Sequence, residues 1–505
     1  MRLRTTARVK QRRWDSKRGC YVYTIEFSTK TPLTDRTLKV AEAFGLGIDE
    51  EHRFVIYRDF ELHLKPGDIV YITGDSGSGK SALLKAIKAD LGDKAIDIDE
   101  VAWDEDRPLI EQVGASFEEG LSLLCRVGLN DAFLFLRRPS ELSDGQLYRF
   151  KLAKLLEAQK PYWICDEFCS TLDRTTARIV AYNIQKQARR VGATLIAATT
   201  HTDLEADLNP SIRIHKGWGE EVSVEYRPNR PAPRCSVAEG ITIREGGLKD
   251  YERLSYLHYR HTGRPGVPIK IYCMERQSEL IGVIVYAYPG PTAKGRREAV
   301  GYTPTLEELN AEWAVISRVI IHPKYRSIGL GIRLVKETLP LVGRRHVELI
   351  AVMAQYNPFA EKAGMKLIRL QRPHPTVWRA IERLRKLGFD PVLMASENYN
   401  LHKLRSLSPE GLEAVREALL TVAPHLYKRI ASTAPGNKPY LKRGEMKAWL
   451  WSRGPEALAR CLRRLNVLSQ TKAYLYWCRD WMERRNMEKI FQDVTGGAHA
   501  SGGDT

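Results

Sequence analysis

The sequence has no hydrophobic run long enough to cross a membrane. A transmembrane helix needs about 20 consecutive apolar residues, whereas the longest apolar stretches here, such as 349–354, have the length of buried strands. The N-terminal stretch MRLRTTARVKQRRW is basic and lacks the apolar segment of a signal peptide. Both absences argue against a membrane-spanning or secreted protein.

Paired cysteines are also absent. The eight cysteines are scattered, with no CxxC pair and no spacing typical of a disulfide framework. Cysteines of this kind are reduced thiols in the cytoplasm. We therefore expect a cytoplasmic protein.

Acidic residues are few relative to basic ones. The chain has 61 Asp and Glu against 79 Lys and Arg, which gives a formal charge of +18 and a pI near 9.4. Such a surface attracts polyanions, namely nucleic acid, an anionic membrane face or phosphorylated cofactors. We favour nucleic acid as the partner, although a generally basic protein would have the same composition.

The residue pattern divides the chain into three main parts, in line with about 150 residues per domain. Strand-like and helix-like runs alternate up to residue 226, and a second mixture ends near residue 371. Apolar residues then recur at helical spacing with basic faces. The expected segments are a basic N-terminal extension (1–35), a first α/β domain (36–226), a Pro/Arg-rich linker (227–234), an α+β domain (235–371), a helical basic region (372–490) and a disordered tail (491–505).

A strand followed by a glycine-rich loop predicts a phosphate-binding site. Residues 69–81 read IVYITGDSGSGKS, which contains the GxxxxGKS pattern of a P-loop. Glycines let backbone N–H groups surround phosphates, and the following helix directs its positive end at them. The alternative is an unrelated Gly-rich loop, which the flanking strand and helix make a poor explanation. The predicted ATP-binding residues here are Gly74, Asp75, Ser76, Gly77, Ser78, Gly79, Lys80 and Ser81, with Ser81 also on Mg²⁺.

A second apolar strand ends in two carboxylates. Residues 161–174 read PYWICDEFCSTLDR. Asp166 is expected to hold the Mg²⁺ shell, and Glu167 to polarise the attacking water. Because this motif lies 86 residues after Lys80, the two together predict an ATP-hydrolysing site.

The segment LSDGQ at 142–146 resembles the signature LSGGQ of the ABC ATPase family. The resemblance implies that Ser143 and Gly145 reach the γ-phosphate bound to a second subunit, with Gln146 closing the motif. Since the chain has one P-loop and one signature, it also implies a homodimer. The alternative interpretation of Ser143 is a helix N-cap, and both interpretations can hold together.

Further positions extend the ABC resemblance. His201 resembles the switch histidine, Ser170–Asp173 the D-loop, Gln112 the Q-loop glutamine on ATP and Mg²⁺, and Phe44 the aromatic that stacks on adenine. The implied catalytic residues are Lys80, Glu167 and His201. The short segment between Lys80 and Leu142 favours a soluble ATPase that acts on nucleic acid, and a transporter ATP-binding subunit remains the alternative.

Residues 316–338, ISRVIIHPKYRSIGLGIRLVKET, resemble motif A of the GNAT acyltransferases, R/Q-x-x-G-x-G/A. The resemblance covers about 235–370, including VELIAVMA at 347–354 and NPFAEKAGM at 357–365. It implies that loop amides bind the pyrophosphate of acetyl-CoA at a helix N-terminus. The alternative is a glycine-containing turn of another α/β domain. The implied acetyl-CoA residues are Val319, Ile321, Arg326, Ser327, Ile328, Gly329, Leu330, Gly331 and Asn357.

The acid–base residues of this second domain are left open. The tyrosine that commonly protonates the departing thiolate would fall at Ala360, and Tyr356 is out of register. A histidine near neutrality can exchange protons, and surface positions are the alternative for each candidate. The candidates are His258, Tyr259, His261, Glu308 and Glu312.

The acyl acceptor is suggested by shorter features. HYRHTGRP and TLEELNAEW resemble segments of the Mom-type GNAT branch, which modifies adenine in phage DNA. The basic C-terminal helices could grip phosphates, although their tryptophans could instead fill a core. We therefore expect an ABC-class ATPase joined to a GNAT-like acyltransferase acting on nucleic acid, with a non-catalytic GNAT domain as the alternative. The tryptophans in question are Trp378, Trp449, Trp451, Trp477 and Trp481.

Overall fold

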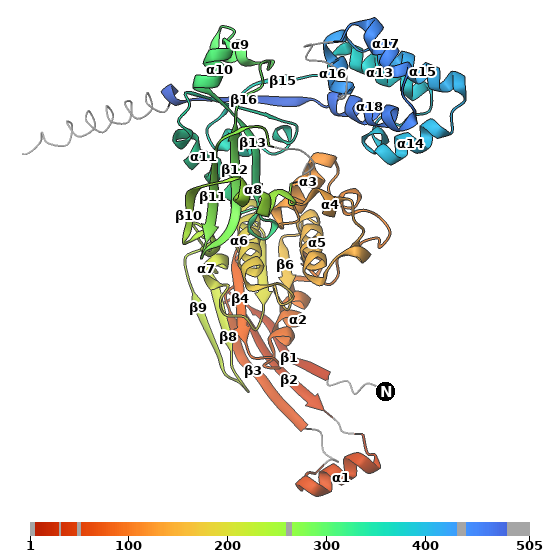
Figure 1. The fold of residues 1–505 in the computed structure, drawn as a ribbon. Coiled ribbons are helices and arrows are strands. Elements are labelled where there is room, and N and C mark those ends of the chain that lie inside the picture. Colours follow the sequence, from red (N-terminus) through yellow and green to blue (C-terminus); the bar gives the residue numbers. More distant parts are fainter. Residues whose placement is uncertain (1–5, 30–31, 48–51, 259–264, 432–440, 482–505) are drawn as a thin grey trace, which may run out of the picture. The chain divides into compact units, whose positions relative to one another are not determined.

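The computed structural model describes residues 6–29, 32–47, 52–258, 265–431 and 441–481. The chain forms two compact units (Figure 1). The first comprises 1–264, 271–284 and 319–334, and the second comprises 265–270, 285–318 and 335–505. Among the described helices, none combines the length and the apolar character needed to cross a membrane.

A six-stranded sheet forms the centre of the first unit. Its order is β5-β6-β7-β4-β8-β9; the first five strands run parallel, and β9 is antiparallel to β8. Strands β4 and β7 are buried along their whole length, as expected when helices cover both faces of a parallel sheet. The strands are β4 (Ile69–Gly74), β5 (Ala95–Asp97), β6 (Tyr162–Cys165), β7 (Thr194–Ala198), β8 (Ile212–Lys216) and β9 (Val222–Tyr226).

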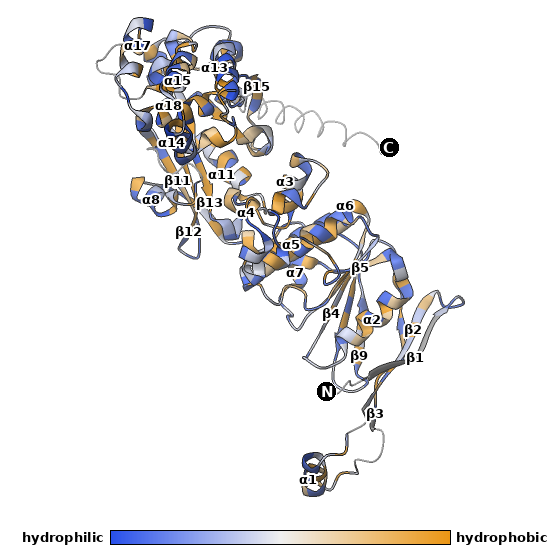
Figure 2. Ribbon diagram, turned by 90° about the vertical axis from the view of Figure 1, so that its right-hand side faces the viewer, coloured by the Kyte–Doolittle hydropathy of each residue, from blue (hydrophilic) through white to orange (hydrophobic). Residues whose placement is uncertain are grey.

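Alternate side chains of this sheet enter two different cores. Ile69, Tyr71 and Trp163 join one core, whereas Val70 and Ile164 join the other. The period of two follows from strand geometry. Figure 2 colours α5 and α6 with both hydrophobic and hydrophilic residues, as expected of helices with one face on a core. The helices that follow β3 in residues 63–264 of this unit are α2 (Lys80–Leu91), α3 (Phe117–Arg126), α4 (Ala132–Phe135), α5 (Asp144–Glu157), α6 (Arg174–Val191), α7 (Glu205–Leu208) and α8 (Leu248–Ser255).

The segment expected to be an N-terminal extension contains two strands. β1 (Thr6–Asp15) and β2 (Cys20–Thr29) pair with β3 (His52–Leu62) in a three-stranded antiparallel sheet. Helix α1 (Asp35–Phe44) lies between β2 and β3 in the chain. Residues of β2, β3 and α2 share one core, so the N-terminal hairpin packs within the first unit and is not a separate extension.

A seven-stranded mixed sheet has the order β10-β11-β12-β13-β14-β16-β15. Strands β13 and β14 are parallel, and α11 lies between them in the chain. The pairs β10–β11, β14–β16 and β15–β16 are antiparallel. Its elements are β10 (Ile241–Gly246), β11 (Pro268–Arg276), β12 (Glu279–Ala287), β13 (Trp313–Ile321), β14 (His346–Ala351), β15 (Lys366–Gln371), β16 (Lys472–Cys478), α9 (Arg296–Val300), α10 (Leu306–Glu312), α11 (Leu330–Thr338) and α12 (Phe359–Lys362).

The helical region is an insertion between two neighbouring strands. β15 ends at Gln371, the helices follow, and β16 then returns to pair with β14 on one side and β15 on the other. We expected helices throughout 372–490, and β16 contradicts this, because KAYLYWC is rich in the aromatic residues that favour strands. The inserted helices are α13 (Pro375–Lys386), α14 (Glu397–Arg405), α15 (Pro409–Leu420), α16 (Tyr427–Ile430), α17 (Arg443–Trp451) and α18 (Pro455–Leu468).

Candidate functional site

The carboxyl ends of three neighbouring parallel strands gather the predicted ATPase residues. The P-loop follows β4, Asp166 and Glu167 follow β6, and His201 lies shortly after β7. In an open α/β sheet, ligands bind at this edge. The topology therefore brings the P-loop, the two carboxylates and the histidine to one side of the sheet.

The P-loop has a backbone that requires glycine at two positions. Gly74 has φ 145°, and a Cβ added there would lie 2.1 Å from the Lys216 carbonyl oxygen. Gly79 has φ 106°, and its Cβ would lie 2.4 Å from Cγ2 of Ile56. The chain then enters α2 at Lys80. The loop is thus packed closely against β8 and β3. The backbone N–H groups of such a loop can bind a phosphate.

The Lys80 side chain lies against the backbone of the P-loop. Its Nζ donates to the carbonyl oxygens of Gly74 at 2.8 Å and Asp75 at 2.6 Å. Burial lowers the pKa of Lys80, and the charges of Asp166 and Asp75 oppose that shift. The hydroxyl of Ser78 is buried and has no hydrogen-bond partner within the described part of the chain. Donors of this kind fit nucleotide phosphates, and the roles of Lys80 on the β- and γ-phosphates and of Ser81 on Mg²⁺ stay predictions.

Glu167 is held in an unusual backbone conformation. Its φ is 46°, which side chains other than glycine rarely adopt. The conformation is fixed by hydrogen bonds from the Glu167 N–H to Asp166 Oδ1 at 3.0 Å and from the Phe168 N–H to the Ala198 carbonyl at 2.7 Å. Neighbouring strands therefore determine where both carboxylates lie.

His201 is tied to the same strands. Its N–H donates to Thr199 Oγ1 at 3.2 Å, and the Tyr71 hydroxyl donates to its carbonyl. Burial lowers the pKa of His201, with the Arg174 charge acting in the same direction. The imidazole is consequently neutral at neutral pH and able to accept or donate a hydrogen bond.

The signature segment forms the N-terminus of α5. Ser143 caps the helix: its side chain accepts from the Gln146 N–H, and Gln146 Oε1 accepts from the Ser143 N–H at 3.1 Å. A Cβ on Gly145 would lie 3.1 Å from Cδ2 of Leu172 in the D-loop segment. The N-cap interpretation of Ser143 is therefore correct, and its role toward a second subunit stays a prediction.

The structure does not bring two predicted ATP ligands to the P-loop. The Gln112 side chain is bonded to the loop at 104–107: Oε1 accepts from the Asp104 N–H at 2.7 Å, and Nε2 donates to the Arg107 carbonyl at 2.6 Å. Contact with Mg²⁺ requires these bonds to break. Phe44 ends α1 and is 76% exposed, and helix α1 lies away from α2 in both views (Figures 1 and 2). The sequence spacing did not reveal that Phe44 lies at the end of a separate helix, α1, between strands β2 and β3 in the chain.

The RSIGLG loop (326–331) packs on the ATPase helices. Arg326 donates through Nε to the Ile321 carbonyl at 2.7 Å and through Nη1 to the Asn130 carbonyl at 2.9 Å. Burial lowers the pKa of this guanidinium. The Arg326 side chain therefore positions the loop, and it is not directed at a ligand as we expected.

Two further contacts join this segment to α6. Lys324 Nζ lies 3.0 Å from Oδ1 of Asp173, which is the last D-loop residue and the N-cap of α6. Asn183 Nδ2 donates to Ser327 Oγ at 2.8 Å. Sequence reasoning missed these contacts, because nothing in the spacing of the two motifs indicates that they meet.

The remaining acyltransferase candidates lie in different settings. Glu308 caps α10 by accepting from the Thr305 N–H at 2.6 Å, and Glu312 lies 3.7 Å from His346. Asn357 donates its N–H to the Met353 carbonyl, and Ala360 is fully buried. His258 ends the described segment after α8, and Tyr356 is 43% exposed; Tyr259 and His261 lie outside the described residues.

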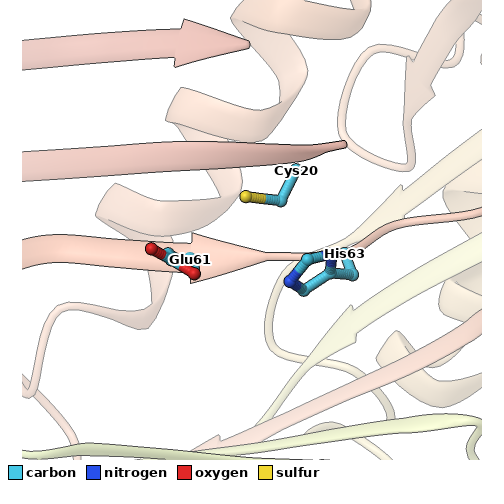
Figure 3. Close-up of side chains that lie close together, drawn as sticks. All are labelled: Cys20, Glu61 and His63. Atoms are coloured by element: carbon cyan, nitrogen blue, oxygen red, sulfur yellow. The ribbon is translucent and has the colours of Figure 1, made fainter. Parts of the chain in front are cut away.

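One group of side chains has the composition of a metal site. Cys20, Glu61 and His63 have donor atoms that lie within 4.8 Å of one another (Figure 3). Glu61, however, already forms an ion pair with Arg18, and burial and the Glu61 charge raise the pKa of the Cys20 thiol. We assign no metal to this group, because its anionic ligand is neutralised by a neighbouring cation.

The chain is similar to ATP-binding proteins of transporters. The family model described as ABC transporter matches residues 57–123. The methionine import ATP-binding protein of Latilactobacillus sakei is 24% identical, over 48% of this chain and 81% of its own. The thiamine import ATP-binding protein of Photobacterium profundum is 29% identical, over 33% and 82%.

Among solved structures, the dimeric ATP-binding cassette MJ0796 bound to ADP and phosphate is 21% identical and covers 35% of this chain and 92% of its own, with a TM-score of 0.30. The segment matched by the family model contains the whole P-loop. The family match therefore supports an ATP-binding domain of the ABC class around the P-loop.

Proposed function

We propose that this protein couples ATP hydrolysis to an acetyl-CoA-dependent N-acyl transfer onto nucleic acid. The observation that carries the proposal is the contact of the RSIGLG loop and its flank with the D-loop and α6, through Lys324–Asp173 and Asn183–Ser327. In this proposal MgATP closes a homodimer of ATPase domains, with Ser143 of one subunit on the nucleotide of the other.

The strand–loop–helix unit from β13 to α11 supports an acyl-CoA site. Gly329 has φ 83°, and α11 begins at Leu330. Amides of residues 328–331 at this helix N-terminus are suited to a pyrophosphate. Val319 and Ile321 lie on β13 leading to the loop. In this proposal Arg326 holds the loop in place, and the amides bind acetyl-CoA.

The Lys324–Asp173 ion pair supports coupling between the two activities. Asp173 caps α6 and accepts from the Thr175 N–H at 3.1 Å, so its position follows that of the D-loop and helix. When nucleotide binding moves the D-loop, Lys324 transmits the movement to the acyl-CoA loop. Coupling of this kind is a free energy shared between two sites and acts in both directions.

The test is an acyl-transfer assay with radiolabelled acetyl-CoA, with and without MgATP, offering DNA, tRNA and bulk protein separately. We expect ATP-dependent label in a nucleic acid. Lys324→Glu should uncouple the two activities and leave basal ATPase unchanged, whereas Lys324→Arg should retain the coupling. Absence of label from every acceptor, alongside intact ATPase activity, would refute the acyltransferase and leave a clamp with a non-catalytic GNAT-like domain.

A transporter subunit is the second candidate, because the similar proteins from Latilactobacillus and Photobacterium are import ATP-binding proteins. This role requires a membrane partner that docks on the ATPase domain. Affinity purification from detergent-solubilised cells distinguishes the two: a stoichiometric integral membrane protein supports the transporter, and bound nucleic acid supports the acyltransferase.

A further inference from the structure

A cavity of about 670 Å³ in the second unit has a cationic lining. It lies where the helical insertion joins the sheet, since its walls include the ends of β15 and β16 and parts of α9 and α16. No aspartate or glutamate is among the described residues that line it. The cationic lining residues are Lys294, Arg296, Arg297, Arg372, Arg429 and Lys472.

Among the residues that the structure describes, most of these cations have no anionic partner. Arg296 is paired with Glu348, at 2.7 Å between Nη2 and Oε1. Two other cations of this unit, Arg369 and Arg345, are paired with Glu298 and Asp480. Within the part of the chain that the structure describes, no hydrogen bond or ion pair is formed by the side chains of Lys294, Arg297, Arg372 and Arg429.

The electrostatic environment inside the cavity is positive. His374 and His425 line it with ring centroids 5.3 Å apart. Burial lowers the pKa of His374, and the charges of His425, Lys294 and Arg379 lower it further. No carboxylate opposes that shift among the described residues. A concave surface with one sign of charge concentrates ligands of the opposite sign.

We propose that this cavity binds the phosphodiester backbone of a nucleic acid. The proposal deepens the proposed function and rests on it, because it assigns the surface that holds the acceptor. Arg and Lys side chains neutralise phosphates, and guanidinium groups bind them bidentately. The volume lies within the range of sites for small ligands and nucleotides. The imidazoles of His374 and His425 provide flat faces on which a base can stack.

Other phosphate-containing ligands could bind cationic side chains in the same way, so the experiment distinguishes them from nucleic acid. The probe is a fluorescein-labelled single-stranded DNA oligonucleotide, and its binding to the full-length protein is followed by fluorescence anisotropy over a range of salt concentrations. Unlabelled competitors are duplex DNA, adenosine monophosphate and coenzyme A. No acyl donor or ATP is added, so the result does not depend on acyl transfer.

The test variant is the double substitution Arg372→Ala and Arg429→Ala. Both side chains are exposed, so the fold should be retained. We expect the affinity to fall at least tenfold. The slope of log K against log salt should decrease by about one for each phosphate that the variant no longer neutralises. The conservative pair Arg372→Lys and Arg429→Lys should keep the salt slope of the parent.

The matched control replaces two exposed cations of α13 that do not line the cavity, Arg383→Ala and Lys386→Ala. It should bind the oligonucleotide as the parent does. Equal weakening in control and test variants would show that general charge, and not the cavity, binds DNA. Displacement of the probe by coenzyme A at lower concentrations than by duplex DNA would overturn the proposal in favour of a cofactor site. Oligonucleotide binding with no acyl transfer would refute the proposed function alone.

Discussion

At the scale of single residues, the two carboxylates after β6 are the proposed centre of the hydrolytic chemistry. Asp166 accepts the Glu167 N–H, and Glu167 has a left-handed backbone that costs roughly 1–2 kcal/mol. Such strain is retained where neighbouring structure fixes it and where function depends on the position of the side chain. We therefore propose Glu167 as the residue that activates the attacking water.

Glu167→Gln should accordingly abolish hydrolysis and leave nucleotide binding intact. The amide keeps the shape of the side chain but cannot accept a proton, and loss of a general base lowers kcat by about 100-fold or more. Steady-state phosphate release and binding of a fluorescent ATP analogue measure the two properties. Normal hydrolysis by the variant would show that another group activates the water. Lys80→Ala is the contrasting variant, because it should weaken binding itself.

A second residue-scale prediction concerns the buried ion pair of the other unit. Arg296 and Glu348 are 5% and 1% exposed, and Tyr474 also donates to Glu348 Oε2 at 2.9 Å. Glu348→Ala leaves a buried guanidinium uncompensated, which costs about 3–5 kcal/mol. Chemical denaturation of this variant should show that loss of stability, and the pair Glu348→Leu with Arg296→Met should recover much of it. A loss below about 1 kcal/mol would mean that water reaches Arg296.

At the scale of elements, the P-loop depends on close packing between β4, β8 and β3. Gly74→Ala puts a Cβ against the Lys216 carbonyl and has a strained φ, so it should destabilise the domain by about 3 kcal/mol or more. Gly77→Ala is the matched control: its φ is 82°, but nothing lies within 4 Å of the added Cβ. It should cost only about 1–2 kcal/mol. Equal losses of stability in urea denaturation would contradict the packing argument.

The elements around the P-loop could be predicted from sequence because their signals are local. The run IVYITG ends at a glycine-rich loop, and the structure has β4 and α2 there. The segment KAYLYWC of β16 also has a local strand signal, but its place between β14 and β15 could not be predicted, because its partners lie about 100 residues or more earlier in the chain. The Gln112 side chain was missed for a similar reason: the loop at 104–107 binds it, and this is a matter of tertiary contact.

The tryptophans of the C-terminal third show what residue type alone leaves open. Trp477 is buried within β16, and Trp449 and Trp451 pack on the core of the helical insertion, whereas Trp378 is 53% exposed. Composition could not distinguish these settings, since aromatic residues serve both cores and ligand surfaces. The cationic cavity was equally hidden, because its side chains come from separate stretches of the chain.

At the scale of the whole molecule, one P-loop and one signature per chain predict two composite sites in a dimer. A mixture of two inactive variants tests this. Lys80→Ala removes the nucleotide from its own P-loop, and a Ser143→Arg variant blocks the signature facing the partner's nucleotide. Mixed dimers contain one intact composite site, so ATPase activity should return to about a quarter of the parent value, because half of the dimers are mixed and each has one of two sites. Light scattering should show a doubled mass with ATP. No recovery would mean that each chain acts alone.

The position of β16 has a consequence for the order in which this protein can form. The strand lies inside the sheet, yet Gln371 pairs with Lys472, so the ribosome makes β16 about 100 residues after β15. Until β16 emerges, β14 and β15 have no partner between them, and their unpaired edges are prone to association with other chains. The inserted helices, whose contacts are local, can fold during this delay. The nascent chain is thus prone to association during this interval, and chaperone demand should be greatest just before β16 emerges from the ribosome.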